Sequence, residues 1–145
     1  MIINIFKGVW FFSLLGLLAV FFYVYASLPE SIVVYGDLEP VRVSKELLFY
    51  ISISWIAIWN VLVYAVPAIM KPKEKFMWWL LGLIVCLNLF FLITISYINV
   101  FNSNERFDYE SIGYVIYGIL SVLIGWMVSW PLYLFFQKII RKQPV

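Results

Sequence analysis

The chain has 145 residues, of which 65% are hydrophobic and 12% charged, and its net charge is +2. Soluble globular domains carry about 25% charged residues, so this composition excludes an ordinary soluble fold and indicates a single membrane domain over 1–145. No basic patch is larger than three spaced lysines, so no nucleic-acid partner is expected. One cysteine and no histidine exclude an internal disulfide and make a metal or other cofactor unexpected.

Four apolar runs without interior charges predict an all-α bundle of four transmembrane helices. The runs cover 9–27, 47–69, 77–101 and 112–136, and each provides the roughly 20 residues that a helix needs to cross the hydrocarbon core. The first run is longer than the roughly 7–15 apolar residues of a signal peptide, so we interpret it as a retained helix. Trp10 lies at a depth suited to the interfacial aromatic belt.

The first polar segment, 28–45, separates the first two helices. Pro29 is expected to end the first helix, and Ser44 is a plausible N-cap for the second. The segment has a distinct order of residues: Leu28-Pro29-Glu30-Ser31-Ile32, then Gly36, Pro40 and Ser44-Lys45.

This order resembles the signature of a small bacterial membrane domain of unknown function, which also forms the N-terminal part of SdpI-type immunity proteins. The matching residues are Leu28, Pro29, Glu30, Ile32, Pro40, Ser44 and Lys45. Tyr35 stands where the family has a histidine, and Val33 where it has a proline. The resemblance implies a multi-pass plasma-membrane protein with an extracytoplasmic hairpin loop. In the better-known members it implies toxin immunity or signalling through binding of another protein.

Asparagine side chains occur in the middle of two apolar runs, Asn60 in the second and Asn88 in the third. An amide in hydrocarbon needs a partner, so we expect the two to bond across neighbouring helices. A polar path for an ion or small solute is the alternative. Ionisable residues, which usually mark such paths, are absent from the interiors of the runs.

The fourth run carries a stripe of small residues at helical spacing: Gly118, Ser121, Gly125 and Ser129. Small residues let two helix backbones approach closely. The stripe is expected to pack within the bundle or, alternatively, to dock a partner protein. Gly16 with Ala19, and Gly82 with Cys86, are candidate matching surfaces within the chain. Ser111 is a candidate N-cap for this fourth helix.

The distribution of charge predicts the orientation in the membrane. Seven of the ten basic residues lie before the first helix, in the loop 70–76 or in the tail 137–145. Seven of the eight acidic residues lie in the other two gaps between the apolar runs, 28–46 and 102–111. Because basic residues remain cytoplasmic, we expect both termini inside a bacterial cytoplasmic (inner) membrane. The basic face is expected to meet anionic lipid headgroups.

The function expected from these features is association rather than catalysis. The acids that general acid–base chemistry would need lie in the outer loops, and no phosphate-binding or nucleophile motif is present. We therefore expect a non-catalytic accessory subunit or immunity-like partner of a larger integral membrane protein or complex. A small transporter or channel is the alternative, and a membrane enzyme using the outer acidic loops is a third possibility.

Overall fold

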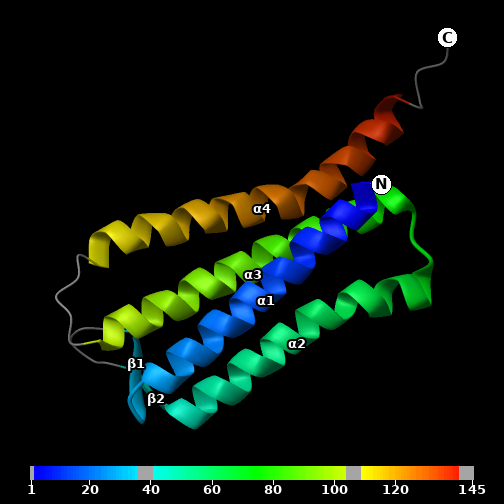
Figure 1. The fold of residues 1–145 in the computed structure, drawn as a ribbon. Helices are drawn as coiled ribbons and strands as arrows, with labels where there is room; N and C mark the ends of the chain where they lie inside the picture. Colours follow the sequence, from blue (N-terminus) through cyan, green and yellow to red (C-terminus); the bar gives the residue numbers. More distant parts are fainter. Residues whose placement is uncertain (1, 36–40, 104–108, 141–145) are drawn as a thin grey trace.

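The computed structural model describes residues 2–35, 41–103 and 109–140 and confirms the all-α four-helix bundle (Figure 1). All four helices are long and apolar enough to cross a membrane. A two-stranded antiparallel sheet joins the first two of them. The elements, in chain order, are α1 (Ile2–Ser27), β1 (Ser31–Tyr35), β2 (Val41–Ser44), α2 (Lys45–Met70), α3 (Glu74–Asn102) and α4 (Tyr109–Ile140).

Helix α3 is the centre of the bundle, since it contacts α1, α2, α4 and β1. Figure 1 shows α1 and α2 on one side of α3 and α4 on the other. The sequence did not decide whether the first helix packs on the second or on the fourth. In the structure α1 packs mainly on α3 and only lightly on α2.

The helix ends follow the expected chemistry at some positions and depart from it at others. Ser44 caps α2 as predicted, because its hydroxyl accepts a hydrogen bond from the Leu47 backbone N–H at 3.2 Å. The prediction for Ser111 is wrong, since α4 begins at Tyr109 and the Ser111 backbone is already helical. Helix α1 begins at Ile2, well before residue 9, and includes Lys7, whose long stem can carry the ammonium to the membrane interface.

The buried side chains form two clusters, and α4 lies outside both. The cluster beside the hairpin contains Leu17, Phe21, Val24, Leu28, Ile32, Ile56 and Ile95. The cluster near the opposite end contains Trp10, Val63, Met77, Leu80, Leu81 and Ile84. Among the described side chains of α4, Leu123 is the only hydrophobic one that is buried. The first three helices therefore form the core, and α4 is attached to its surface.

The charges are segregated between the two ends of the bundle. The start of α1, the α2–α3 connection and the end of α4 lie at one end (Figure 1). We call this the basic end, and its described charged residues are Lys7, Lys71, Lys73, Glu74, Lys75 and Lys138. The hairpin end carries Glu30, Arg42, Lys45 and Glu46.

Candidate functional site

The two intramembrane asparagines bond to each other, as expected. Asn60 Nδ2 donates to Asn88 Oδ1 at 3.0 Å, and Asn88 Nδ2 donates to Asn60 Oδ1 at 3.2 Å. Trp10 Nε1 adds a bond to Asn60 Oδ1 at 2.8 Å, and Asn88 Nδ2 also donates to Ser13 Oγ at 3.0 Å. The four residues form an amide cluster that joins α1, α2 and α3.

Every side-chain amide N–H group of this amide cluster has a hydrogen-bond acceptor within the protein. The second Asn60 N–H reaches the Ile56 carbonyl at 2.8 Å, so both amide groups donate all of their protons to protein acceptors. Trp10 is only 7% exposed, so its ring lies inside the bundle rather than in the interfacial belt that the sequence predicted. A buried amide without partners would cost about 1–3 kcal/mol. The cluster therefore acts as an interhelical clasp, that is, a set of hydrogen bonds that holds α1, α2 and α3 together.

The motif residues of the first polar segment have structural roles where they are described. Leu28 and Ile32 are buried in the hairpin-side cluster, at 5% and 0% exposure. The Lys45 ammonium lies over the Tyr25 ring, 5.0 Å from its centroid. The backbone N–H of Lys45 donates to the Glu30 carbonyl at 3.0 Å. The Pro29 and Glu30 side chains are exposed, and Pro40 lies outside the described residues.

Two further asparagines, which the sequence analysis did not single out, join α3 to the hairpin and to the end of α1. The side chain of Asn102 accepts from the Val33 N–H at 2.8 Å and donates to the Val33 carbonyl at 2.9 Å. It thereby pairs with the edge of β1 as a third strand would. Ser27 Oγ donates to Asn99 Oδ1 at 2.8 Å. The signal in the sequence was a pair of amides three residues apart at the end of an apolar run.

The stripe of small residues on α4 faces away from the bundle. Gly118, Ser121, Gly125 and Ser129 are all exposed, and a Cβ added to either glycine would meet nothing within 4 Å. The two hydroxyls bond carbonyls of their own helix, those of Tyr117 and Trp126. The expectation that this stripe packs within the bundle is therefore wrong. A helix has only one face toward a single neighbour, and in α4 that face holds larger side chains.

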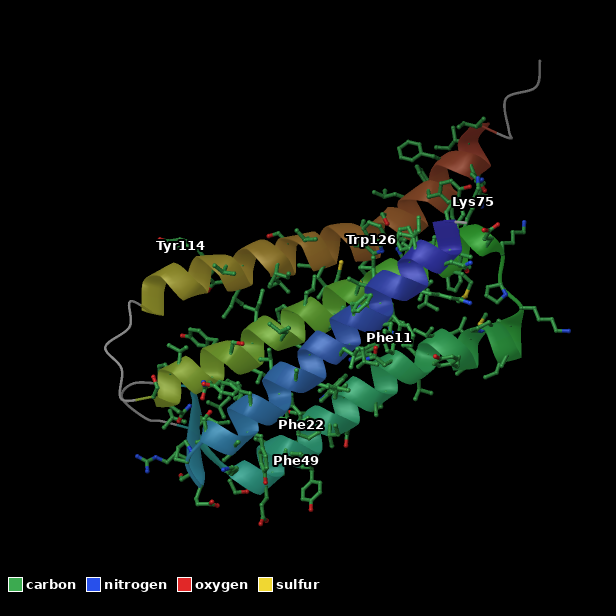
Figure 2. All side chains as sticks on the ribbon, in the orientation of Figure 1. Phe11, Phe22, Phe49, Lys75, Tyr114 and Trp126 are labelled. Carbon is green, nitrogen blue, oxygen red and sulfur yellow. The ribbon has the colours of Figure 1, made fainter. Side chains whose placement is uncertain are left out.

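Helix α4 is attached to α3 by a pair of tryptophans. Trp79 Nε1 donates to the Trp126 carbonyl and Trp126 Nε1 to the Trp79 carbonyl, both at 2.9 Å. The Trp126 ring lies against Gly82, where a Cβ would clash with it. Figure 2 shows Trp126 between the two helices, whereas Tyr114, nearer the start of α4, points away from α3. Of the candidate matching surfaces, Gly82 receives a large ring and Gly16 meets nothing within 4 Å.

The acidic loops give no candidate metal centre in the part of the chain that is described. No group of three or more His, Cys, Asp or Glu side chains able to hold a metal occurs among the described residues. Asp37, Glu39, Glu105, Asp108 and Glu110 lie where no side chain is described. Comparisons with protein-family models, with curated proteins and with solved structures give no match to this chain.

Proposed function

We propose that this chain is a non-catalytic multi-pass protein of a bacterial cytoplasmic membrane that acts by binding another integral membrane protein through α4. Its role is then that of an accessory subunit or an immunity-like partner. The observation that carries the proposal is the outward direction of the small-residue stripe. Helix interfaces in lipid are enriched in small residues because these let two backbones approach closely, and the stripe on α4 is exposed.

The burial of the helices supports this proposal. Helix α4 is the least buried of the four candidate spans, and it is attached through the Trp79–Trp126 pair rather than through the core. The amide cluster, by contrast, donates all of its amide protons inside the protein. A transport path through Asn60 and Asn88 would have to break these bonds. Association through α4 requires no rearrangement of the core.

The test is affinity purification from the native membrane in mild detergent, followed by mass spectrometry. We expect a stoichiometric integral membrane partner to co-purify with the wild-type protein. Gly125→Leu should reduce recovery of that partner at least several-fold, because a side chain in the stripe keeps the two backbones apart. The variant should still insert and fold, since a Cβ at residue 125 meets nothing within 4 Å.

A matched control places the same leucine elsewhere on α4. Met127→Leu changes an exposed apolar residue on a different face of α4 from the stripe and should leave partner recovery unchanged. Recovery of the protein alone, or equal recovery of the partner with Gly125→Leu, would contradict the proposal. Solute flux in reconstituted vesicles that is lost with Asn60→Leu would instead support the transporter.

A further inference from the structure

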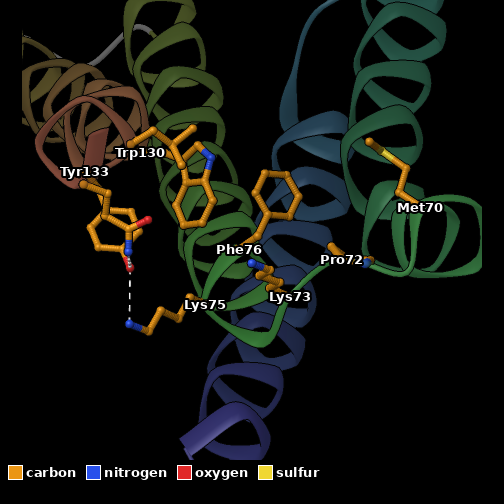
Figure 3. A pocket seen from close by; sticks show the side chains of 9 residues that line it. Met70, Pro72, Lys73, Lys75, Phe76, Trp130 and Tyr133 are labelled. Carbon is orange, nitrogen blue, oxygen red and sulfur yellow. Dashed lines mark hydrogen bonds between the residues drawn. The ribbon is translucent and has the colours of Figure 1, made fainter. Parts of the chain in front are cut away.

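A cavity of about 430 Å³ lies at the basic end, between the α2–α3 connection and the last turns of α4 (Figure 3). One wall is formed by Met70, Pro72, Lys73, Lys75 and Phe76, and the other by Trp130, Tyr133, Leu134 and Gln137. Figure 1 shows the C-terminal part of α4 diverging from α3 here. Pro131 lies inside this part of α4, and a proline within a helix removes a backbone hydrogen bond and favours a bend.

The polar groups of the cavity are suited to an anion. Lys73 and Lys75 both line it, and no Asp or Glu is among its lining residues. Lys73 is also the N-cap of α3 and makes no side-chain capping bond. The start of a helix carries a partial positive charge and free N–H groups. Glu74, the nearest acidic residue in sequence, is exposed and does not line the cavity.

Tyr133 supplies a further donor at the same place. Its hydroxyl oxygen accepts from Lys75 Nζ at 3.2 Å and from Gln137 Nε2 at 2.6 Å (Figure 3 shows the first bond). Because the oxygen accepts both bonds, its own proton is available for another acceptor. The hydroxyl and the Lys75 ammonium can therefore donate to the same anionic oxygen.

The remaining surface of the cavity is apolar and aromatic. Phe76 and Trp130 meet edge to face with their centroids 5.1 Å apart. Met70, at 69% exposure, and Leu134, at 48%, continue this surface outward onto the faces of α2 and α4. Charged donors therefore lie beside apolar surface at the depth where helices leave the hydrocarbon. A soluble anion would use only the charged part of this site.

We propose that the cavity binds one anionic phospholipid, with its phosphate held by Lys73, Lys75 and Tyr133 and an acyl chain against Met70 and Leu134. Lysines near an anionic membrane surface contribute about 1 kcal/mol each. This corresponds to about a fivefold change in affinity per lysine. Because the two walls come from the α2–α3 connection and from α4, the bound lipid also fixes α4 against the core at the basic end.

The experiment counts lipids retained by the purified protein. The protein is reconstituted in nanodiscs of mixed phosphatidylglycerol and phosphatidylcholine, released into mild detergent, and analysed by native mass spectrometry. We expect one phosphatidylglycerol retained in preference to phosphatidylcholine. Lys73→Gln and Lys75→Gln should each weaken this retention about fivefold.

Lys71→Gln is the matched control, because it removes the same charge from the same connection at an exposed residue outside the cavity. It should retain the lipid as the wild type does. Equal losses in all three variants, or equal retention of the two lipids by the wild type, would overturn the proposal. Binding of inorganic phosphate in lipid-free micelles with the same lysine dependence would also overturn it, since the site would then serve a soluble anion.

Discussion

At the scale of single residues, the buried polar side chains of this protein act as fasteners between helices. Asn60 and Asn88 join α2 to α3, and Trp10 and Ser13 bring α1 into the same cluster. Asn102 fastens β1 to α3 in a similar way. In lipid, apolar contact does not distinguish a neighbouring helix from an acyl chain, so such bonds help to fix which helices meet.

The amide cluster gives a prediction about stability. Asn60→Leu leaves the Trp10 N–H without its acceptor and removes both bonds to Asn88. We expect the free energy of unfolding to fall by about 1–2 kcal/mol, the upper part of the range measured for polar contacts in membranes. Titration with SDS in mixed micelles measures this change.

Two further variants test whether the loss arises from the cluster. Ser121→Ala removes an exposed hydroxyl that bonds only within its own helix, and its effect should stay within about 0.5 kcal/mol. Trp10→Phe combined with Asn60→Leu should cost less than the two single changes added together, because both remove the same bond. Strict additivity, or a stable Asn60→Leu protein, would argue against a clasp.

At the scale of elements, the attachment of α4 to α3 depends on one glycine. The Trp126 ring occupies the space where a Gly82 side chain would be. Gly82→Ala should therefore displace Trp126 and destabilise the protein by about 1–3 kcal/mol, the usual cost of overpacking. Gly118→Ala adds the same methyl group on the open face of α4 and should be neutral or slightly stabilising. Titration of both variants with SDS measures the change in the free energy of unfolding. Equal changes in the two variants would mean that the Trp126 contact is unimportant.

The elements also show which features the sequence could predict. Apolar runs of membrane-spanning length predicted all four helices, and Ser44 predicted the start of α2. The amide pairing was predictable because two amides in hydrocarbon have few possible partners. The Trp79–Trp126 pair could not be predicted, because tryptophans near a helix end are equally suited to the membrane interface. The direction of the small-residue stripe depends on which face of α4 meets α3. The apolar residues of α4 are spread around the whole helix, so their spacing does not identify that face.

At the scale of the whole molecule, the separation of charge between the ends predicts one orientation in the membrane. Among the described residues, the end where α1 begins and α4 finishes carries five lysines and only one acid, Glu74. The hairpin end carries two basic residues, Arg42 and Lys45, and two acids, Glu30 and Glu46. Positively charged flanks are retained in the cytoplasm. In this orientation the lipid cavity lies in the cytoplasmic leaflet and the hairpin faces outward. The opposite orientation would place the cavity in the outer leaflet.

Cysteine labelling in whole cells tests this orientation. In a Cys86→Ser background, single cysteines replace Arg42 in the hairpin and Glu74 at the start of α3, both exposed positions outside the lipid cavity. We expect a membrane-impermeant maleimide to label the residue-42 variant in cells whose outer barrier has been removed but whose inner membrane is intact. The residue-74 variant should react only after that membrane is permeabilised. The reverse pattern would place the hairpin in the cytoplasm. Labelling of both positions in sealed cells would mean that the chain inserts in two orientations, because the charge difference between its ends is too small to select one.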